Sequence, residues 1–140
     1  MGKKFRGPEL VKQIDEAMDK GLARFITLTQ SKLSQANPVD TGRMASSWFI
    51  GQGAPNRSTR SENWAEPGAG RVRNPKPDFE ITMKSDHWIS NSLPYANRVA
   101  TDPLYAKGGR RGAADWYTRI ENNLAKDAER AFDYWLRKVK

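Results

Sequence analysis

Two long amphipathic segments, one near each end of the chain, limit the folds that this sequence can adopt. Residues 8–36 and 113–139 carry apolar residues at steps of three and four, which places them on one side of an α-helix. Pro8 suits the first turn of the first helix. Asn37-Pro38 ends that helix, because proline disfavours a helical conformation in the residue before it. Gly21, inside this helix, indicates either a bend or a close contact with another helix.

The segment between the two helices carries strand patterns instead. Residues 46–50 are rich in strand-forming side chains, and residues 79–83 alternate between apolar and polar. Residues 87–90 follow after a short polar break, which predicts a hairpin of 79–83 with 87–90. Residues 95–99 fit either a further strand or a turn of helix. The order predicts one α+β domain with a small, mostly antiparallel sheet between a long N-terminal and a long C-terminal helix.

Two segments lack any apolar period, and we expect long loops at 51–78 and 101–112. We also expect a flexible N-terminus at 1–7. Loops of this length are uncommon in compact domains and are usually functional or disordered. Arginine suits phosphate groups because its planar fork can donate two hydrogen bonds at once. The basic loop residues that are candidates for facing a partner or a lumen are Arg57, Arg60, Arg71, Arg73, Lys76, Lys107, Arg110 and Arg111.

The chain carries a net charge of +8, from 24 basic and 16 acidic residues. A chain with this excess is attracted to polyanions. The excess is shared nearly evenly along the sequence, and the basic residues are not expected to cluster on either helix. A small basic nucleic-acid-binding protein is an alternative function, although no known nucleic-acid motif is present.

Groups that catalysis or metal binding would need are scarce. The sequence has no cysteine, which excludes disulfides, zinc thiolates and thiol chemistry. His87 is the single histidine, and its neighbour Asp86 would point to the opposite face of a strand. No nucleophile elbow, phosphate-binding loop or calcium loop appears. We expect no catalytic residue, cofactor or metal. No apolar run of membrane-spanning length and no secretory signal are visible, so no membrane partner is expected.

The most specific stretch is residues 38–48, Pro-Val-Asp-Thr-Gly-Arg-Met-Ala-Ser-Ser-Trp. Asp40 or Thr41 can cap the free N–H groups of a following helical turn, and Gly42 tolerates a tight backbone. From its residues alone, the segment is a chain reversal that leads through a turn into a strand beginning at Trp48.

This stretch resembles a motif of the tail-completion, or head–tail joining, proteins of long-tailed bacteriophages. In that family a long N-terminal helix precedes Val-Asp-Thr-Gly-Arg-Leu-x-x-Ser, followed by a small sheet, Tyr-Ala-x-x-Val-Glu-x-Gly and a C-terminal helix. Here Met44 takes the leucine place, while Ala100 and Asp102 replace the glutamate and the glycine of the second motif. The motif residues that become candidates for a subunit interface are Val39, Asp40, Thr41, Gly42, Arg43, Ser47, Trp48, Tyr95, Ala96 and Val99.

The resemblance implies a non-enzymatic virion protein of the phage neck that is assembled in the host cytoplasm and forms a ring of six subunits. Such a ring would contact a connector protein on the head side and a tail-terminator ring on the tail side. A positive lumen would attract the backbone of packaged DNA without sequence preference. The adjacent tail-terminator role is a second possibility within the same part of the particle.

Overall fold

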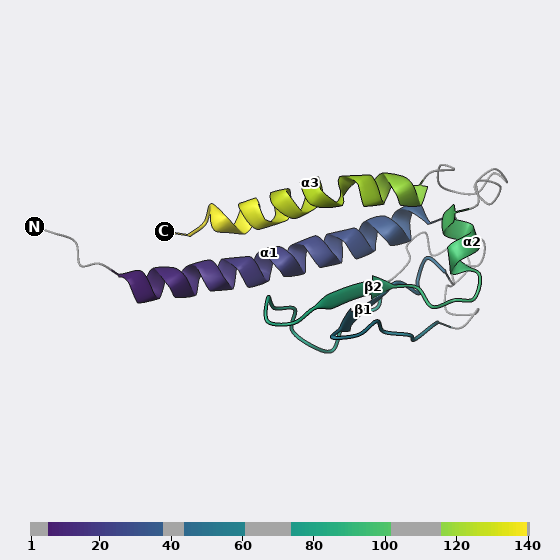
Figure 1. Ribbon diagram of the computed structural model, residues 1–140, viewed down its shortest axis with the longest axis horizontal. Coiled ribbons are helices and arrows are strands. Elements are labelled where there is room, and N and C mark those ends of the chain that lie inside the picture. Colours follow the sequence, from purple (N-terminus) through teal and green to yellow (C-terminus); the bar gives the residue numbers. More distant parts are fainter. Residues whose placement is uncertain (1–5, 38–43, 61–73, 102–115, 140) are drawn as a thin grey trace, which may run out of the picture.

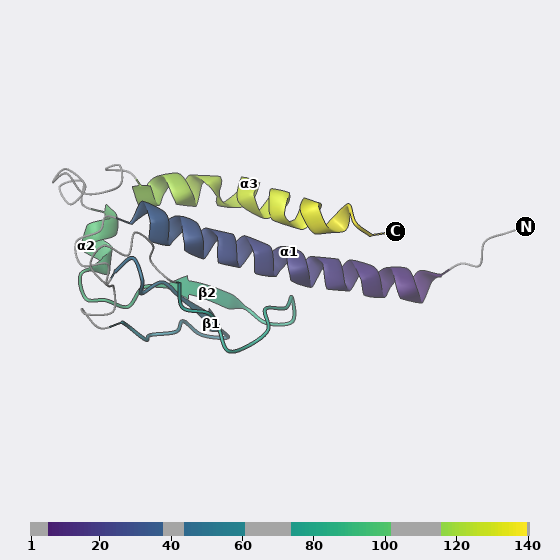
Figure 2. The same ribbon diagram turned by 180° about the vertical axis from the view of Figure 1, so that it is seen from behind.

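The first helix of the protein lies between the second long helix and a small sheet. The computed structural model describes residues 6–37, 44–60, 74–101 and 116–139. Its elements are α1 (Gly7–Ala36), β1 (Phe49–Gln52), β2 (His87–Ser90), α2 (Ala96–Thr101) and α3 (Trp116–Leu136). Figure 1 and, from behind, Figure 2 show α3, α1 and the sheet as three successive layers. The predicted α+β class is confirmed.

The two long helices run antiparallel, and the residues between them are small where the backbones come closest. A Cβ atom built on Gly21 of α1 would lie 2.6 Å from Cδ1 and 3.0 Å from Cα of Phe132 on α3. Ala17 and Ala131 are buried in the same seam. Gly21 therefore marks a close helix contact, one of the two roles that the sequence indicates. In the described part of the chain, no helix is long and apolar enough to cross a membrane.

The sheet consists of β1 and β2 paired antiparallel, with Ile50 opposite Ile89 and Gly51 opposite Trp88. The predicted hairpin of residues 79–83 with 87–90 is wrong, because β2 takes its partner from the segment after the first motif. Residues 79–83 form no strand, and the Met83 N–H donates to Asp19 Oδ1 of α1 at 2.8 Å instead. The alternation in 79–83 reflects the burial of Ile81 against α1, not a ladder partner.

Several predicted boundaries shift by a few residues. Gly7, expected in a flexible terminus, already belongs to α1, and the strand expected at 46–50 runs over 49–52. Gly53 follows the strand with φ +73°, a left-handed conformation that glycine adopts without strain. Residues 95–99, left open between strand and helix, lead into α2. Residues 1–5, 61–73 and 102–115 lie outside the described residues.

The apolar interior forms two clusters along α1. One lies between the middle of α1 and the sheet and contains Ile26, Ile50 and Ile81. The other lies where the C-terminal end of α1 meets the N-terminal end of α3, and it is the larger. α1 contributes to both, so the position of the sheet relative to α3 is set through this helix.

Replacing Gly21 by valine should destabilise the protein by about 1–3 kcal/mol, because the added side chain meets the Phe132 backbone, which cannot move aside cheaply. Ala125→Val, at an exposed position of α3, adds the same β-branching and should cost less than about 1 kcal/mol. Urea denaturation of both variants measures the difference. Equal losses would mean that the helices do not pack closely at Gly21.

Candidate functional site

The two segments that carry the family-like motifs meet in one place in the structure. Trp48 at the end of the first motif and Ala96 and Val99 of the second are all buried in the larger apolar cluster. α1 and α3 complete this cluster. We call it the motif junction, and its buried members are Leu33, Met44, Trp48, Leu93, Ala96, Val99, Trp116 and Ile120.

Aromatic rings from the first motif and from α3 interlock at the motif junction. The rings of Trp48 and Trp116 lie edge to face, with centroids 6.3 Å apart at 79°, and Trp48 stacks on Tyr117 at 6.4 Å. Such pairs stabilise by about 0.5–1.5 kcal/mol beyond the area they bury. Burial, with a smaller contribution from the negative charge of Glu121, raises the pKa of Tyr117. These contacts tie the start of α3 to the first motif.

Buried hydrogen bonds fix the backbone around Trp48. Its indole N–H donates to Asn37 Oδ1 at 3.1 Å, just after the last turn of α1. Gln30 Nε2 donates to the carbonyl oxygens of Trp48 at 2.7 Å and of Pro75 at 2.9 Å. Asn91 Nδ2 donates to the carbonyl oxygen of Met44 at 2.8 Å. The amide side chains of Gln30 and Asn91 therefore donate to backbone carbonyl oxygens that lie outside helices and strands. These hydrogen bonds hold the loop segments around Met44, Trp48 and Pro75 in place.

The same region holds both described ends of the long connection that contains residues 61–73. At one end, the N–H of Arg60 donates to Ser47 Oγ at 3.1 Å. At the other, Asn74 accepts a hydrogen bond from Ser34 and donates to Ser31 Oγ at 3.3 Å, both on α1. The connection thus leaves from and returns to the motif junction.

The described motif residues stabilise the interior of the chain. Ser47, Trp48, Ala96 and Val99 are buried, and Tyr95 is half-buried against the same cluster. Buried side chains present little surface to a neighbouring subunit, so their structural role here is to hold the fold. The other predicted interface residues, Val39, Asp40, Thr41, Gly42 and Arg43, lie outside the described residues.

The structure describes three of the predicted basic loop residues and leaves the others outside the described residues. Arg57 and Lys76 are exposed on the two sides of the long connection. Arg60 is half-buried, and this burial lowers the pKa of its guanidinium group from the ordinary value. The remaining candidates, Arg71, Arg73, Lys107, Arg110 and Arg111, lie outside the described residues.

Gln30 and Asn37 are the residues that sequence reasoning missed. Gln30 follows Ile26 by four residues and precedes Leu33 by three, so it lies on the same side of α1 as these two buried residues. A polar residue at a buried helical position must find hydrogen-bond partners, and this spacing is a signal that could have been used. At Asn37 the sequence indicates only the end of the helix, whereas the structure buries its side chain fully.

The described residues bring together few groups suited to chemistry. No group of three or more histidine and acidic residues there could hold a metal ion. The His87 ring stacks on Phe79 with centroids 6.0 Å apart, and its buried Nε2 has no hydrogen-bond partner among the described residues. The motif junction is thus a packed structural centre.

The chain matches no protein-family model, no curated protein and no solved structure. The likeness to tail-completion proteins therefore depends on the motif residues and on the order of the elements.

Replacing Gln30 by leucine should destabilise the protein by at least about 2 kcal/mol. The variant keeps a similar volume but leaves two buried carbonyl oxygens without their donor, at about 1–3 kcal/mol each. Gln35→Leu, at an exposed position of the same helix, is the matched control and should change stability by less than about 0.5 kcal/mol. Chemical denaturation measures both, and similar values for the two variants would contradict a structural role for Gln30.

Proposed function

We propose that this protein is a structural subunit of the neck of a tailed bacteriophage and forms a ring at the joint between head and tail. In this role it catalyses no reaction. Its partners are copies of itself, arranged as a hexamer, a connector protein on the head side and a tail terminator on the tail side. The observation that carries the proposal is an apolar side of α1 that continues, uncovered, beyond the end of α3.

This uncovered part of α1 results from the difference in length between the helices. α1 has 30 residues and α3 has 21, so α1 is longer by about 13 Å at the helical rise of 1.5 Å per residue. Figure 1 shows the N-terminal turns of α1 extending past the C-terminal end of α3. Residues 8–16 are all exposed, and Ala17 is the first buried residue. We call residues 8–16 the overhang.

The overhang exposes apolar side chains on the side that faces α3 further along. Leu10, Val11 and Ile14 are 43%, 58% and 39% exposed. On a helical projection, Leu10 and Ile14 lie close to the direction of Gly21, which contacts Phe132 of α3. The seam between the helices therefore continues as an open apolar stripe, and association with another protein would remove it from water.

A second exposed apolar surface lies on the other side of α1. Met83 and Trp88 are 50% and 48% exposed, in the turn before β2 and on β2 itself. Two different apolar surfaces on one chain suit a head-to-tail contact, in which one surface of each copy meets the other surface of the next. Contacts of this kind generate closed rings when the rotation between copies closes.

The motifs support this class of assembly. Their order along the chain, between two long helices, is the order that the resemblance to tail-completion proteins implies. Both described motif segments pack into one junction that positions α3 on α1. A rigid junction at one end and an uncovered apolar end at the other suit a building block whose contacts are made with neighbours in a particle.

Replacing Val11 and Ile14 together by glutamine should weaken self-association at least tenfold, because it removes apolar area from the contact. Sedimentation velocity over a range of protein concentrations, alone and with candidate connector and terminator proteins, measures the assembly state. Negative-stain microscopy of the largest species shows whether it is a ring.

Lys12→Gln/Glu16→Gln is the matched control, since both residues are exposed on the overhang and the double change leaves the net charge unaltered. It should assemble as the unmodified chain does. A chain that stays monomeric at all concentrations and with every neck protein would refute the proposal.

A further inference from the structure

A group of cations and aromatic rings lies where the last turns of α3 pack against the middle of α1. The side-chain nitrogen of Lys20 is 5.0 Å from the centroid of the Trp135 ring, and Arg24 Cζ is 4.1 Å from that of Tyr134. Lys138 Nζ lies 4.1 Å and 4.8 Å from the same two rings, Tyr134 and Trp135. We call these five residues the cation–aromatic cluster. Ring faces hold the cations in place and leave their N–H groups free for an anion.

None of the three cations is paired with a carboxylate in the part of the chain that the structure describes. Lys138 Nζ donates to the Tyr134 hydroxyl at 3.0 Å. This hydrogen bond first, then the charges of Lys138 and Arg24, lower the pKa of Tyr134. The neighbouring cations would thus stabilise a negative charge at this position.

The cluster continues along α3 as a ridge. Lys126, Arg130 and Tyr134 follow one another at steps of four, which places them in a row on one side of α3. Lys138 extends this row from the turn after Leu136, with its Nζ 3.0 Å from the Tyr134 hydroxyl. All four are exposed. Each step rises about 6 Å, so the row is about 18 Å long.

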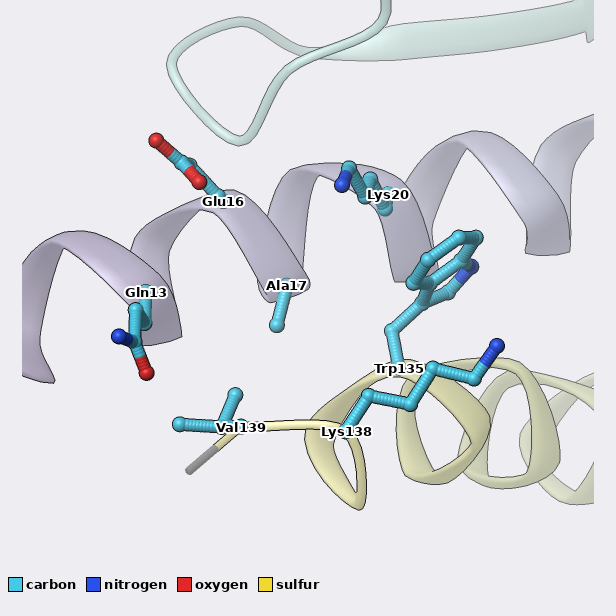
Figure 3. Close-up of a pocket in the computed structure, with 7 residues that line it drawn as sticks. All are labelled: Gln13, Glu16, Ala17, Lys20, Trp135, Lys138 and Val139. Carbon is cyan, nitrogen blue, oxygen red and sulfur yellow. The ribbon is translucent and has the colours of Figure 1, made fainter.

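Three carboxylates near the ridge are paired or turned away, whereas Glu129 is exposed beside Arg130. Asp127 pairs with Lys32 at 2.5 Å, and Asp133 pairs with Arg137 at 2.8 Å. Glu16 lines a cleft of about 170 Å³ next to Lys20 and Lys138, but Figure 3 shows its carboxylate directed away from Trp135 and Lys138. Within the described residues, Lys126, Arg130 and Lys138 have no carboxylate partner.

We propose that the cation–aromatic cluster and its ridge bind the phosphate backbone of duplex DNA. Phosphates follow one another at about 3.4 Å along the axis of each strand, so a row of about 18 Å can follow about five of them. Three of the five cations are lysines, which are depleted at protein interfaces, and this favours a nucleic acid over an acidic protein. The contact is independent of base sequence.

This inference deepens the proposed function and rests on it for the source of the duplex, which is DNA passing through the neck. The surface itself belongs to a single chain. Binding can therefore be measured separately from assembly.

The test measures binding of the full chain to a fluorescent duplex of arbitrary sequence by anisotropy, from about 50 to 200 mM salt. Lys20→Gln/Arg130→Gln/Lys138→Gln should lose at least about tenfold in affinity, and its salt slope should fall by about 2 to 3. Arg6→Gln/Lys12→Gln/Lys84→Gln removes the same charge at exposed positions elsewhere and should lose less than about threefold.

Several outcomes would overturn the inference. These are no binding by the unmodified chain at low salt, equal binding by the ridge variant, or a larger loss in the control, which would assign the contact to the start of α1 and the turn before β2. A ridge variant that loses a neck protein instead of DNA would assign the surface to an acidic protein.

Circular dichroism checks that each variant folds. If the ridge variant does not, Lys126→Gln/Arg130→Gln keeps the cation–aromatic contacts intact and should still lower the salt slope by about 1 to 2. Sedimentation in the same buffers separates the two proposals. A chain that assembles without binding DNA overturns only this inference, whereas a chain that binds DNA as a strict monomer overturns only the proposed function.

Discussion

α1 is packed on two sides, and the rest of the structure depends on this constraint. One side needs small residues, because Gly21 lies against the backbone of Phe132. The other side needs apolar residues, such as Ile26, that pack against the sheet. It also needs Gln30, whose side-chain amide donates hydrogen bonds to two loop carbonyl oxygens. The two packings converge at the C-terminal end of α1, where the motif junction forms. Changes there would move the sheet and α3 together, whereas changes in the overhang would leave the fold intact.

The same side of one helix is therefore buried in its C-terminal part and open in its N-terminal part. A short isolated helix is marginal in water, because the first turn is costly to form. The overhang avoids this cost by extending a helix that packing has already stabilised. Its apolar residues then remain ordered in water, and a partner that covers them loses little conformational entropy on binding.

The sequence predicts the features that depend on local periodicity. Both helices follow from steps of three and four, and the close contact at Gly21 is one of the two roles that the sequence indicates for this glycine. The pairing of strands was not predictable in this way. Residues 79–83 alternate because Ile81 packs on α1, and alternation reports which face is buried without naming a ladder partner.

The site was less predictable because its interactions link distant residues. Gln30 and the carbonyl of Pro75 are 45 residues apart, and no local pattern relates them. The ridge on α3 is visible as a spacing of four, yet the cations of α1 join it only through the packing of the two helices. The resemblance makes the motif residues interface candidates, whereas the burial of Trp48 and Val99 shows that these two side chains pack in the interior of the chain.

Salt should affect the two proposed contacts in opposite directions, because it screens the repulsion between copies but weakens the binding of phosphate. Apolar contacts through the overhang do not depend on salt, but every added copy brings a net charge of +8, and repulsion opposes the assembly. Salt screens this repulsion over about 10 Å at 0.1 M, and it weakens phosphate binding at the same time. A duplex bound along the ridges would neutralise the cations of several copies at once. By mass action it would then favour the assembled state over the free chain, so DNA and ring closure would stabilise each other.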